Sequence, residues 1–347
     1  MQNLNKEKRN KPIYSLFNLK CICAFLVVLL HTNMIGKGFL MPIAAMAVPL
    51  FFMISGFFLL NDDNRIITSN KLKKQLQKLG KLFFIGNLIY LSIDIPAYIF
   101  NWQLGFGVPY LYQITTLKFW LMQFIIGDCI AAHLWFLTAM ILALVIIAIF
   151  DYFQKINLLF RGLPILILSN ILIGRYSFLL GNTSPVQIEW YCNFIFPGLE
   201  FIIIGMWIKK NINFLLSKLG KNINSIFLLA MVCYYIESFI LYKLNYKADW
   251  GNLTILTPIV CILCFVMCIQ KTDLGKNTFL NTIGKEFSTQ IYVYHILCIW
   301  ICNLIIKRIL HINISSIETI VVFGITLMLC YGLKCIQSNF KFSTKNG

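Results

Sequence analysis

Apolar runs long enough to cross a bilayer recur along almost the whole sequence. Windows of about 19 residues find them near residues 14–34, 43–60, 80–100, 133–150, 163–180, 194–208, 225–242, 253–270, 289–309 and 317–335. Only α-helices and closed barrels satisfy their own backbone hydrogen bonds in lipid, and these runs are far too long for barrel strands. The sequence therefore predicts an all-α polytopic membrane protein, a bundle of about ten transmembrane helices.

Composition agrees with a membrane protein along its full length. Hydrophobic residues make up 59% of the sequence and charged residues 12%, against about 25% charged in a soluble domain. We expect a single transmembrane domain over residues 14–335, between a basic amino terminus (1–13) and a short tail (336–347). The shorter stretch FWLMQFIIGDCI at 119–130, which ends near Asp128, is expected to be an interfacial or re-entrant helix. An eleventh span there is the alternative.

The basic residues give the predicted bundle an orientation. The net charge is +17, and most of the 30 Lys and Arg residues fall in alternate gaps between apolar runs. By the positive-inside rule, those gaps and both termini are expected in the cytoplasm, with the protein in the plasma membrane. The charge thus indicates contact with anionic membrane lipids, and we expect no nucleic-acid partner. The sequence does not indicate an oligomeric state.

The first apolar run, NLKCICAFLVVLLHTNM, carries a lysine and a histidine. Lys20 and His31 are separated by about three helical turns, so they share one helix face about 16 Å apart along the axis. Ionisable groups within a membrane span are costly, which favours a functional role. The alternative is that Lys20 extends to the inner interface along its aliphatic stem while His31 lies among the outer headgroups.

Several segments together are similar to a known family. They are Lys20 and His31 with ten residues between them, VPLFFMISGFFLL in the second run, NKLKKQLQKLGKLFF entering the third, HLWFLTAMI, FPGLEFIIIGMWI and STQIYVYHI. In this order the set resembles the acyltransferase-3 family of membrane O-acyltransferases. The resemblance implies that an acyl group, usually acetyl, passes from cytoplasmic acyl-CoA to a hydroxyl group of a glycan or related acceptor, often at the outer face.

The resemblance also implies roles for the first-run residues. His31 matches the essential histidine of the family, and Lys20 matches its basic partner, which is more often arginine. A lysine keeps the charge but lacks the planar fork that binds phosphate in a bidentate manner. Acyl transfer to an alcohol needs a base for the hydroxyl proton, and an imidazole suits that task. Direct attack on the donor and a transient acyl-histidine are both open as mechanisms.

The lysine-rich loop before the third run is the expected donor site. Lys73, Lys74 and Lys78, together with Lys20, are predicted to hold the phosphates of coenzyme A as point charges, with Ser55 as a further donor-binding residue. Acetyl-CoA is expected as a donor substrate and not as a permanently bound cofactor. We expect no metal site, because the cysteines lack metal-ligand spacing.

Further candidates have both functional and structural interpretations. Glu200 could orient His31 or bind sugar hydroxyls, or pair with a cation such as Arg175. His133, Trp135, Tyr292 and His295 are candidate substrate-binding residues. The alternative for Trp135 is an interfacial anchor, and for His295 a hydrogen-bonded packing residue.

The nature of the acceptor is open at the level of sequence. Capsular polysaccharide, teichoic acid, peptidoglycan and a lipid-linked sugar are all compatible with the pattern. The competing function is a multi-pass transporter or flippase for a small polar solute or lipid-linked glycan, or a membrane module that supplies a partner enzyme. A transporter has no need for a cytoplasmic lysine cluster at this position, which favours the acyltransferase.

Overall fold

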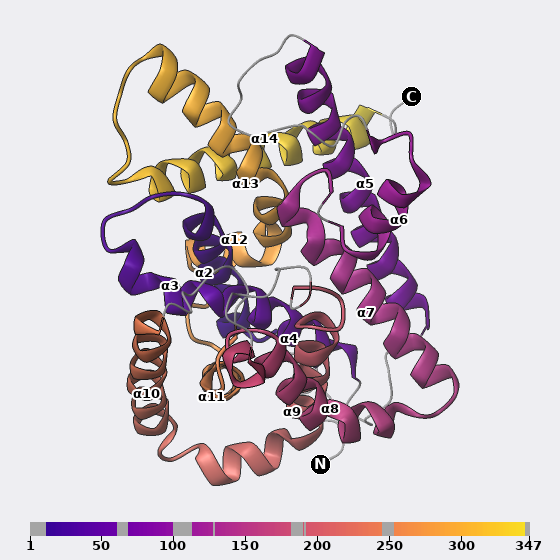
Figure 1. The fold of residues 1–347 in the computed structure, drawn as a ribbon, viewed down its shortest axis with the longest axis vertical. Helices are drawn as coiled ribbons and strands as arrows, with labels where there is room; N and C mark the ends of the chain where they lie inside the picture. The colour runs from indigo at the N-terminus through magenta and orange to yellow at the C-terminus, as the bar shows by residue number, and fades with distance from the viewer. Residues whose placement is uncertain are drawn as a thin grey trace.

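The computed structural model describes residues 12–60, 69–99, 113–127, 129–181, 190, 192–244 and 253–343. Within these ranges all of the secondary-structure elements are helices, so the predicted all-α class is confirmed. Figure 1 shows the helices packed as a bundle. They are α2 (Tyr14–His31), α3 (Lys37–Ala45), α4 (Ala47–Leu59), α5 (Ser69–Ile99), α6 (Leu117–Ile125), η2 (Ala132–Leu134), α7 (Trp135–Tyr152), α8 (Ile156–Ile173), η3 (Ser177–Leu180), α9 (Gly198–Leu219), α10 (Ile223–Lys243), α11 (Leu256–Gln270), α12 (Phe279–Glu286), α13 (Ser288–Cys302), η5 (Asn303–Ile309) and α14 (Glu318–Ser343).

Eight helical segments of the described chain are long and apolar enough to cross a membrane. The other two predicted spans are also helices, α9 and α11. Helix α11 is apolar but shorter, and α9 carries Lys209 and Lys210 in its second half. Helix α6 has only 9 residues, about 14 Å of helix, and is too short to cross alone. Its length fits the predicted interfacial or re-entrant helix, while Asp128 lies outside the described residues.

The second span is divided into two helices. It begins at Lys37, earlier than the apolar run suggested, and is interrupted at Met46 between α3 and α4. The interruption lies one turn before Pro49, whose nitrogen has no hydrogen to donate to the preceding turn. The bend expected around Pro49 and the Ser55–Gly56 pair therefore falls at the proline end of the run.

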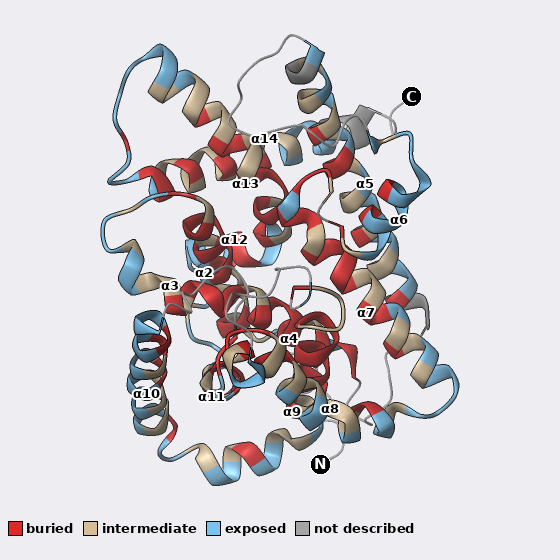
Figure 2. Cartoon of the chain, viewed as in Figure 1, coloured by how far each residue is buried: buried red, intermediate tan, exposed pale blue. Residues whose placement is uncertain are grey.

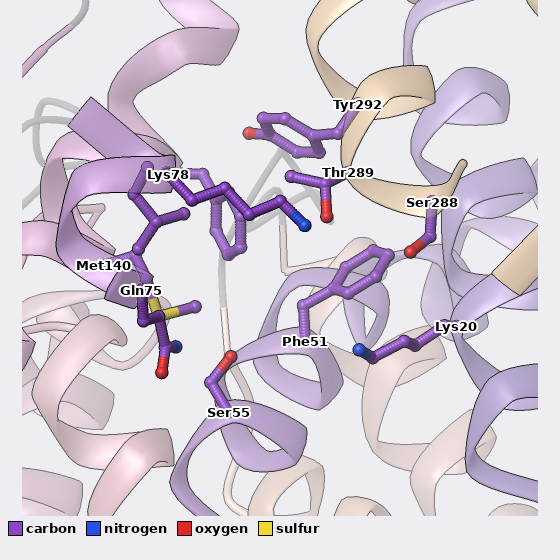
Figure 3. A pocket seen from close by; sticks show the side chains of 11 residues that line it. Lys20, Phe51, Ser55, Gln75, Lys78, Met140, Ser288, Thr289 and Tyr292 are labelled. Atoms are coloured by element: carbon purple, nitrogen blue, oxygen red, sulfur yellow. The ribbon is translucent and has the colours of Figure 1, made fainter. Parts of the chain in front are cut away.

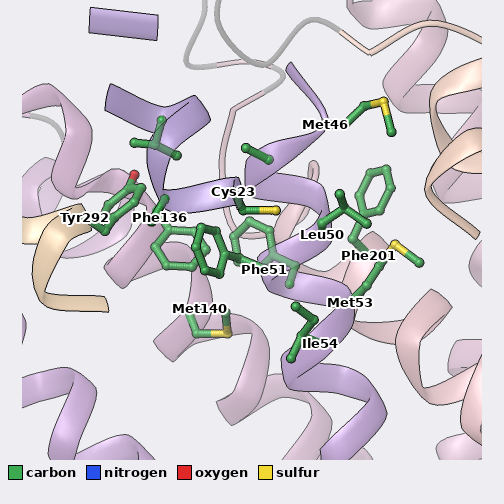
Figure 4. Packing of buried hydrophobic residues seen from close by; sticks show 14 of the residues in the cluster. Cys23, Met46, Leu50, Phe51, Met53, Ile54, Phe136, Met140, Phe201 and Tyr292 are labelled. Carbon is green, nitrogen blue, oxygen red and sulfur yellow. The ribbon is translucent and has the colours of Figure 1, made fainter. Parts of the chain in front are cut away.

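The core lies around α2 and α4. Helix α2 packs against α3, α4 and α11 to α14, while α4 packs most extensively against α9. Figure 2 shows buried residues concentrated in these central helices and exposed residues along α8, α10 and α14. Phe51, Phe136 and Phe201 fill the space between α4, α7 and α9 (Figure 4). Exposed apolar residues on the outer helices are what lipid contact requires.

The amino-terminal end of α2 is tied to the segment before α13. Asn281 Nδ2 of α12 donates a 3.0 Å hydrogen bond to the carbonyl of Tyr14. Asn18 Nδ2 donates a 2.8 Å bond to the carbonyl of Leu274. Gly284 of α12 lies against the backbone of Phe17, so closely that a Cβ there would overlap its carbonyl. The turn of α2 that precedes Lys20 is therefore fixed in place.

The carboxyl-terminal end of α2 is fixed by a polar network with α3 and α14. Lys37 Nζ donates to the carbonyls of Thr32 at 2.6 Å and Leu30 at 3.3 Å, which satisfies groups that a helix end leaves open. Glu318 accepts hydrogen bonds from the backbone and side-chain amides of Asn33 at 3.1 and 3.3 Å. Lys307 pairs with the same carboxylate at 2.7 Å. This network directly follows His31.

Candidate active site

A cavity of about 220 Å³ lies between α2, α4, α5, α7 and α13. Figure 3 shows Lys20 and Lys78 at this cavity, with their amino groups turned into it. Ser55 reaches it from α4 and Tyr292 from α13. The full lining is Lys20, Phe51, Ser55, Gln75, Lys78, Leu79, Phe136, Met140, Ser288, Thr289 and Tyr292. Three predicted donor-site residues from three separate helices thus meet in one cavity.

Two other lysines of the predicted donor site do not line the cavity. Lys73, Lys74 and Lys78 are all exposed residues of α5, but only Lys78, further along the helix, lines the cavity. Residues four apart share a helix face, so Lys74 is on the side of α5 that also carries Lys78. The sequence predicts that Lys73, Lys74 and Lys78 all belong to the donor site, but of these three only Lys78 lines the cavity.

Three of the four histidines in the sequence gather in one cluster. His31 is the last residue of α2, His133 lies in η2 and His295 in α13. The ring centroids of His31 and His295 are 5.0 Å apart, and those of His133 and His295 are 5.2 Å apart. Side chains from widely separated parts of the sequence therefore meet within the membrane-spanning region.

His133 and two tyrosines hold the cluster together. His133 Nε2 lies 3.2 Å from the carbonyl of Val293, and because a carbonyl only accepts, this nitrogen carries a hydrogen. Tyr90 donates to the same carbonyl at 2.7 Å. Tyr292 donates to the carbonyl of His133 at 2.6 Å. These bonds join α5, η2 and α13, and they give His133 and Tyr292 structural contacts in addition to any contact with a substrate.

Tyr292 connects the cavity with the histidine cluster. Its side chain lines the cavity, and its ring centroid lies 6.2 Å from that of His133 and 6.0 Å from that of His295. On α13, Tyr292 is three residues from Thr289 and three from His295, so it is the helix-surface neighbour of both. The cavity therefore reaches to within one helical turn of the cluster.

Lys20 and His31 mark the two ends of this arrangement. Both lie on the single unbroken helix α2, as the spacing predicted, about 16 Å apart along its axis. Lys20 lines the cavity, and His31 belongs to the cluster above it. A cationic pocket and a group of imidazoles are thus aligned along one helix.

Comparison with known proteins decides the family. A family model described as an acyltransferase domain, that of the acyltransferase-3 family, matches residues 13–335, nearly the entire chain. The chain belongs to the acyltransferase-3 family. With its apolar helices, it is a membrane acyltransferase. No curated protein and no solved structure matches the chain.

Glu200 of this acyltransferase lies on α9 and contacts α8. It is in the first turn of α9, where the helix dipole favours an acid, and it is 1% exposed. Asn170 Nδ2 of α8 donates to its carboxylate at 2.6 Å. The contact that the structure gives Glu200 is therefore with α8, and its suggested action on His31 stays a prediction.

Trp135 packs inside the acyltransferase domain. It is the first residue of α7 and half-buried, and its ring centroid lies 6.3 Å from that of Phe52 in α4. The interfacial anchor and the sugar platform both stay open as predictions for this ring. Its role in substrate binding stays untested.

Some residues of the site were not predicted from the sequence. Ser288, Thr289 and Gln75 line the cavity, and Tyr90 supports the histidine cluster. The signal for Ser288 and Thr289 was present, because they lie four and three residues before Tyr292 and so on its helix face. In the described part of the chain, no group of three or more His, Cys, Asp or Glu side chains is arranged to hold a metal ion.

Proposed function

We propose that this membrane acyltransferase moves an acyl group, acetyl in the first instance, from cytoplasmic acyl-CoA to a hydroxyl group of a cell-surface glycan or related acceptor. One observation carries the proposal: Tyr292 lines the same cavity as Lys20 and Lys78, and its ring lies beside a cluster of histidines that contains His31. A transferase that uses an anionic thioester needs both a cationic pocket and a nearby base.

The donor would enter from the side that carries Lys78. Lys20 and Lys78 would bind phosphate groups as point charges, and the hydroxyls of Ser55, Ser288 and Thr289 could bind the amides of the pantetheine arm. A volume of about 220 Å³ suits a narrow arm better than a nucleotide. The nucleotide would then lie nearer the exposed Lys73 and Lys74, whose charge would attract the donor.

His31 would supply the base for the transfer. In direct attack, one of its ring nitrogens takes the hydroxyl proton as the alcohol oxygen bonds to the thioester carbonyl carbon, the carbon–sulfur bond breaks, and the proton passes to the leaving thiolate. The products are an ester and coenzyme A with a free thiol. If His31 is acylated first, thiol release precedes acceptor binding, with a burst of about one thiol per enzyme.

The orientation belongs to the same proposal. We place the protein in the plasma membrane with both termini in the cytoplasm, so that the lysine side of the cavity faces the acyl-CoA pool. His31, near the opposite end of α2, then lies in the outer half of the membrane. An acceptor could reach it from outside while the donor remains inside.

Labelled acetyl-CoA offered to purified protein in lipid nanodiscs tests the function. The hydroxyl probe is octyl β-D-glucoside, added well below its micelle-forming concentration, and transfer is followed by thiol release and by label on the glucoside. We compare wild type with His31→Ala, and with His311→Asn as the matched control, because His311 is exposed and lies outside the cluster. Asn also accepts the positive φ of that position.

The expected result is transfer by wild type and His311→Asn and none by His31→Ala. Activity in the His31→Ala protein would overturn the role of His31. If folded wild type neither binds acetyl-CoA nor releases thiol, the acyl-CoA proposal fails, and the histidine cluster becomes a candidate path for a polar solute or protons.

A further inference from the structure

His295 is held in one tautomer by its own helix. Its side chain is 0% exposed, and Nδ1 lies 2.8 Å from the carbonyl of Tyr292 and 3.2 Å from that of Ile291. Carbonyl oxygens only accept hydrogen bonds, so Nδ1 carries the hydrogen. In a neutral imidazole the other nitrogen, Nε2, then has an open lone pair and acts only as an acceptor.

That acceptor is buried without a hydrogen bond. Among the described residues, no partner within hydrogen-bond distance satisfies His295 Nε2. Leaving a buried acceptor unsatisfied costs on the order of 1–3 kcal/mol, and most buried polar atoms in proteins are paired. An acceptor held in this state inside a candidate active site points to a neighbouring donor that comes within hydrogen-bond distance during the reaction.

The neighbours of His295 identify the donor. Its ring contacts the rings of His31, His133 and Tyr292, with centroids 5.0, 5.2 and 6.0 Å away. His133 uses its Nε2 hydrogen on Val293, and the Tyr292 hydroxyl donates to the His133 carbonyl. His31 has the nearest of the three rings and is the one proposed to gain a proton during catalysis.

We propose that His295 is a positioning residue for acyl transfer, which accepts a hydrogen bond at Nε2 from His31. The proposal rests on the role given above to His31. One nitrogen of His31 takes the hydroxyl proton, and its other nitrogen donates its N–H to His295. His295 thereby orients His31 toward the hydroxyl and stabilises the positive charge that His31 holds until the proton moves to the leaving thiolate.

A neutral imidazole suits this position better than a carboxylate. A buried carboxylate would carry a large desolvation cost, whereas a neutral ring with a fixed lone pair is already directed by its Nδ1 bonds. Inside a low-dielectric bundle, a hydrogen bond to a charged donor is stronger than in water. The interaction would therefore be strongest when His31 is protonated, which is the condition for accelerating the chemical step.

Two isosteric variants separate this role from simple packing. The substitution His295→Gln places an acceptor near the position of Nε2, while His295→Asn places an amide near Nδ1 and leaves the Nε2 position empty. In the glucoside assay we expect His295→Asn to lower kcat about 100-fold with KM for acetyl-CoA changed less than about threefold. His295→Gln should retain activity within about tenfold of wild type.

A structural role predicts the reverse order. If His295 only anchors α13 through Nδ1, Asn should preserve function better than Gln, and this outcome overturns the proposal. A wild-type rate in His295→Asn overturns it as well.

The tautomer can be tested without any change to His295. Nitrogen-15 NMR of histidine-labelled wild type should show one buried ring with a hydrogen on Nδ1 and a bare Nε2, and another, His133, with the opposite pattern. With the signals of His31 and His311 assigned by their loss in His31→Ala and His311→Asn, two remaining rings that both carry the hydrogen on Nε2 overturn the proposal. A wild type that lacks acyl transfer refutes the proposed function, whereas active wild type with inactive His31→Ala and fully active His295→Asn refutes only this inference.

Discussion

Gly56 of α4 and Gly205 of α9 each lie against the backbone of the opposite helix. A Cβ on Gly56 would overlap the carbonyl of Ile202, and a Cβ on Gly205 would overlap the carbonyl of Met53. Small residues are what allow membrane helices to approach this closely. The cavity residue Ser55 is next to Gly56, so this crossing also determines where α4 meets the donor site.

We expect Gly56→Ala and Gly205→Ala to destabilise the protein by about 1–3 kcal/mol each, because a methyl group must force the two backbones apart. The measurement is thermal unfolding in detergent or nanodiscs. Gly324→Ala in α14 is the control, since a Cβ there meets nothing within 4 Å. Alanine should be neutral or slightly stabilising at that position. Equal melting temperatures for Gly56→Ala and Gly324→Ala would contradict the close crossing.

The two lysines that line the cavity, Lys20 and Lys78, should matter more for donor binding than Lys73 and Lys74, which do not line it. Loss of a charge-assisted hydrogen bond costs about 1.5–3 kcal/mol, so Lys20→Ala or Lys78→Ala should raise KM for acetyl-CoA about tenfold or more. Lys73→Ala and Lys74→Ala should change it less than about threefold, because these side chains do not line the cavity and salt screens their charges. A larger effect from Lys73 or Lys74 than from Lys78 would place the phosphates outside the cavity.

Lys20→Arg is a separate test of the phosphate contact. Arginine is the more common residue of the family at this position, and its planar guanidinium can bind a phosphate with two parallel hydrogen bonds. We expect Lys20→Arg to retain donor binding or to lower KM for acetyl-CoA. Loss of binding in Lys20→Arg, equal to that in Lys20→Ala, would show that space at this position matters more than charge.

The carboxylate of Glu318 should be structurally important. It is 3% exposed and joins Lys307 and Asn33 beside the end of α2, so Glu318→Ala leaves a lysine and an amide without their partner. We expect a loss of about 1–3 kcal/mol in unfolding free energy, because the buried carboxylate pairs with a lysine that is 33% exposed, and reduced transfer, since His31 directly precedes this network. Glu286→Ala is the control, because the pair of Glu286 with Lys334 is exposed and such pairs contribute less than about 1 kcal/mol. Similar losses in both variants would contradict the special role of Glu318.

Tyr292→Phe tests whether the tyrosine hydroxyl is structural. Its hydrogen bond goes to the backbone carbonyl of His133, so we expect a stability loss of about 1 kcal/mol and a transfer rate within about tenfold of wild type. Melting temperature and kcat are measured together. A loss of more than about 100-fold in kcat without a change in stability would instead indicate direct contact of the hydroxyl with the reacting groups.

The predictable part of this molecule is the part that repeats along the chain. Long apolar runs identify spans because lipid leaves the backbone few alternatives. The alignment of Lys20 with His31 follows from helix geometry alone. The interruption at Met46 could be predicted in part from Pro49, because a proline weakens the helical turn before it.

The assembly of the site could not be predicted in the same way. Which lysine of α5 enters the cavity depends on the rotation of that helix against α2 and α4, and the segment has lysines on several faces. His133 and His295 meet His31 only because α5, η2 and α13 are joined through the carbonyl of Val293. Contacts between side chains far apart in sequence have no local periodicity to reveal them.

Helix α2 is fastened at both ends, by α12 near Tyr14 and by α3 and α14 beyond His31. It therefore holds Lys20 of the cationic pocket and the proposed base, His31, at a fixed separation of about 16 Å along its axis. In the proposed function, a donor must match that length to contact Lys20 and His31 at the same time. Short thioesters that carry the same acetyl group but lack the phosphate-bearing arm should not contact Lys20 and His31 at once. Under the proposed function, the enzyme would therefore select its donor by length as well as by chemistry.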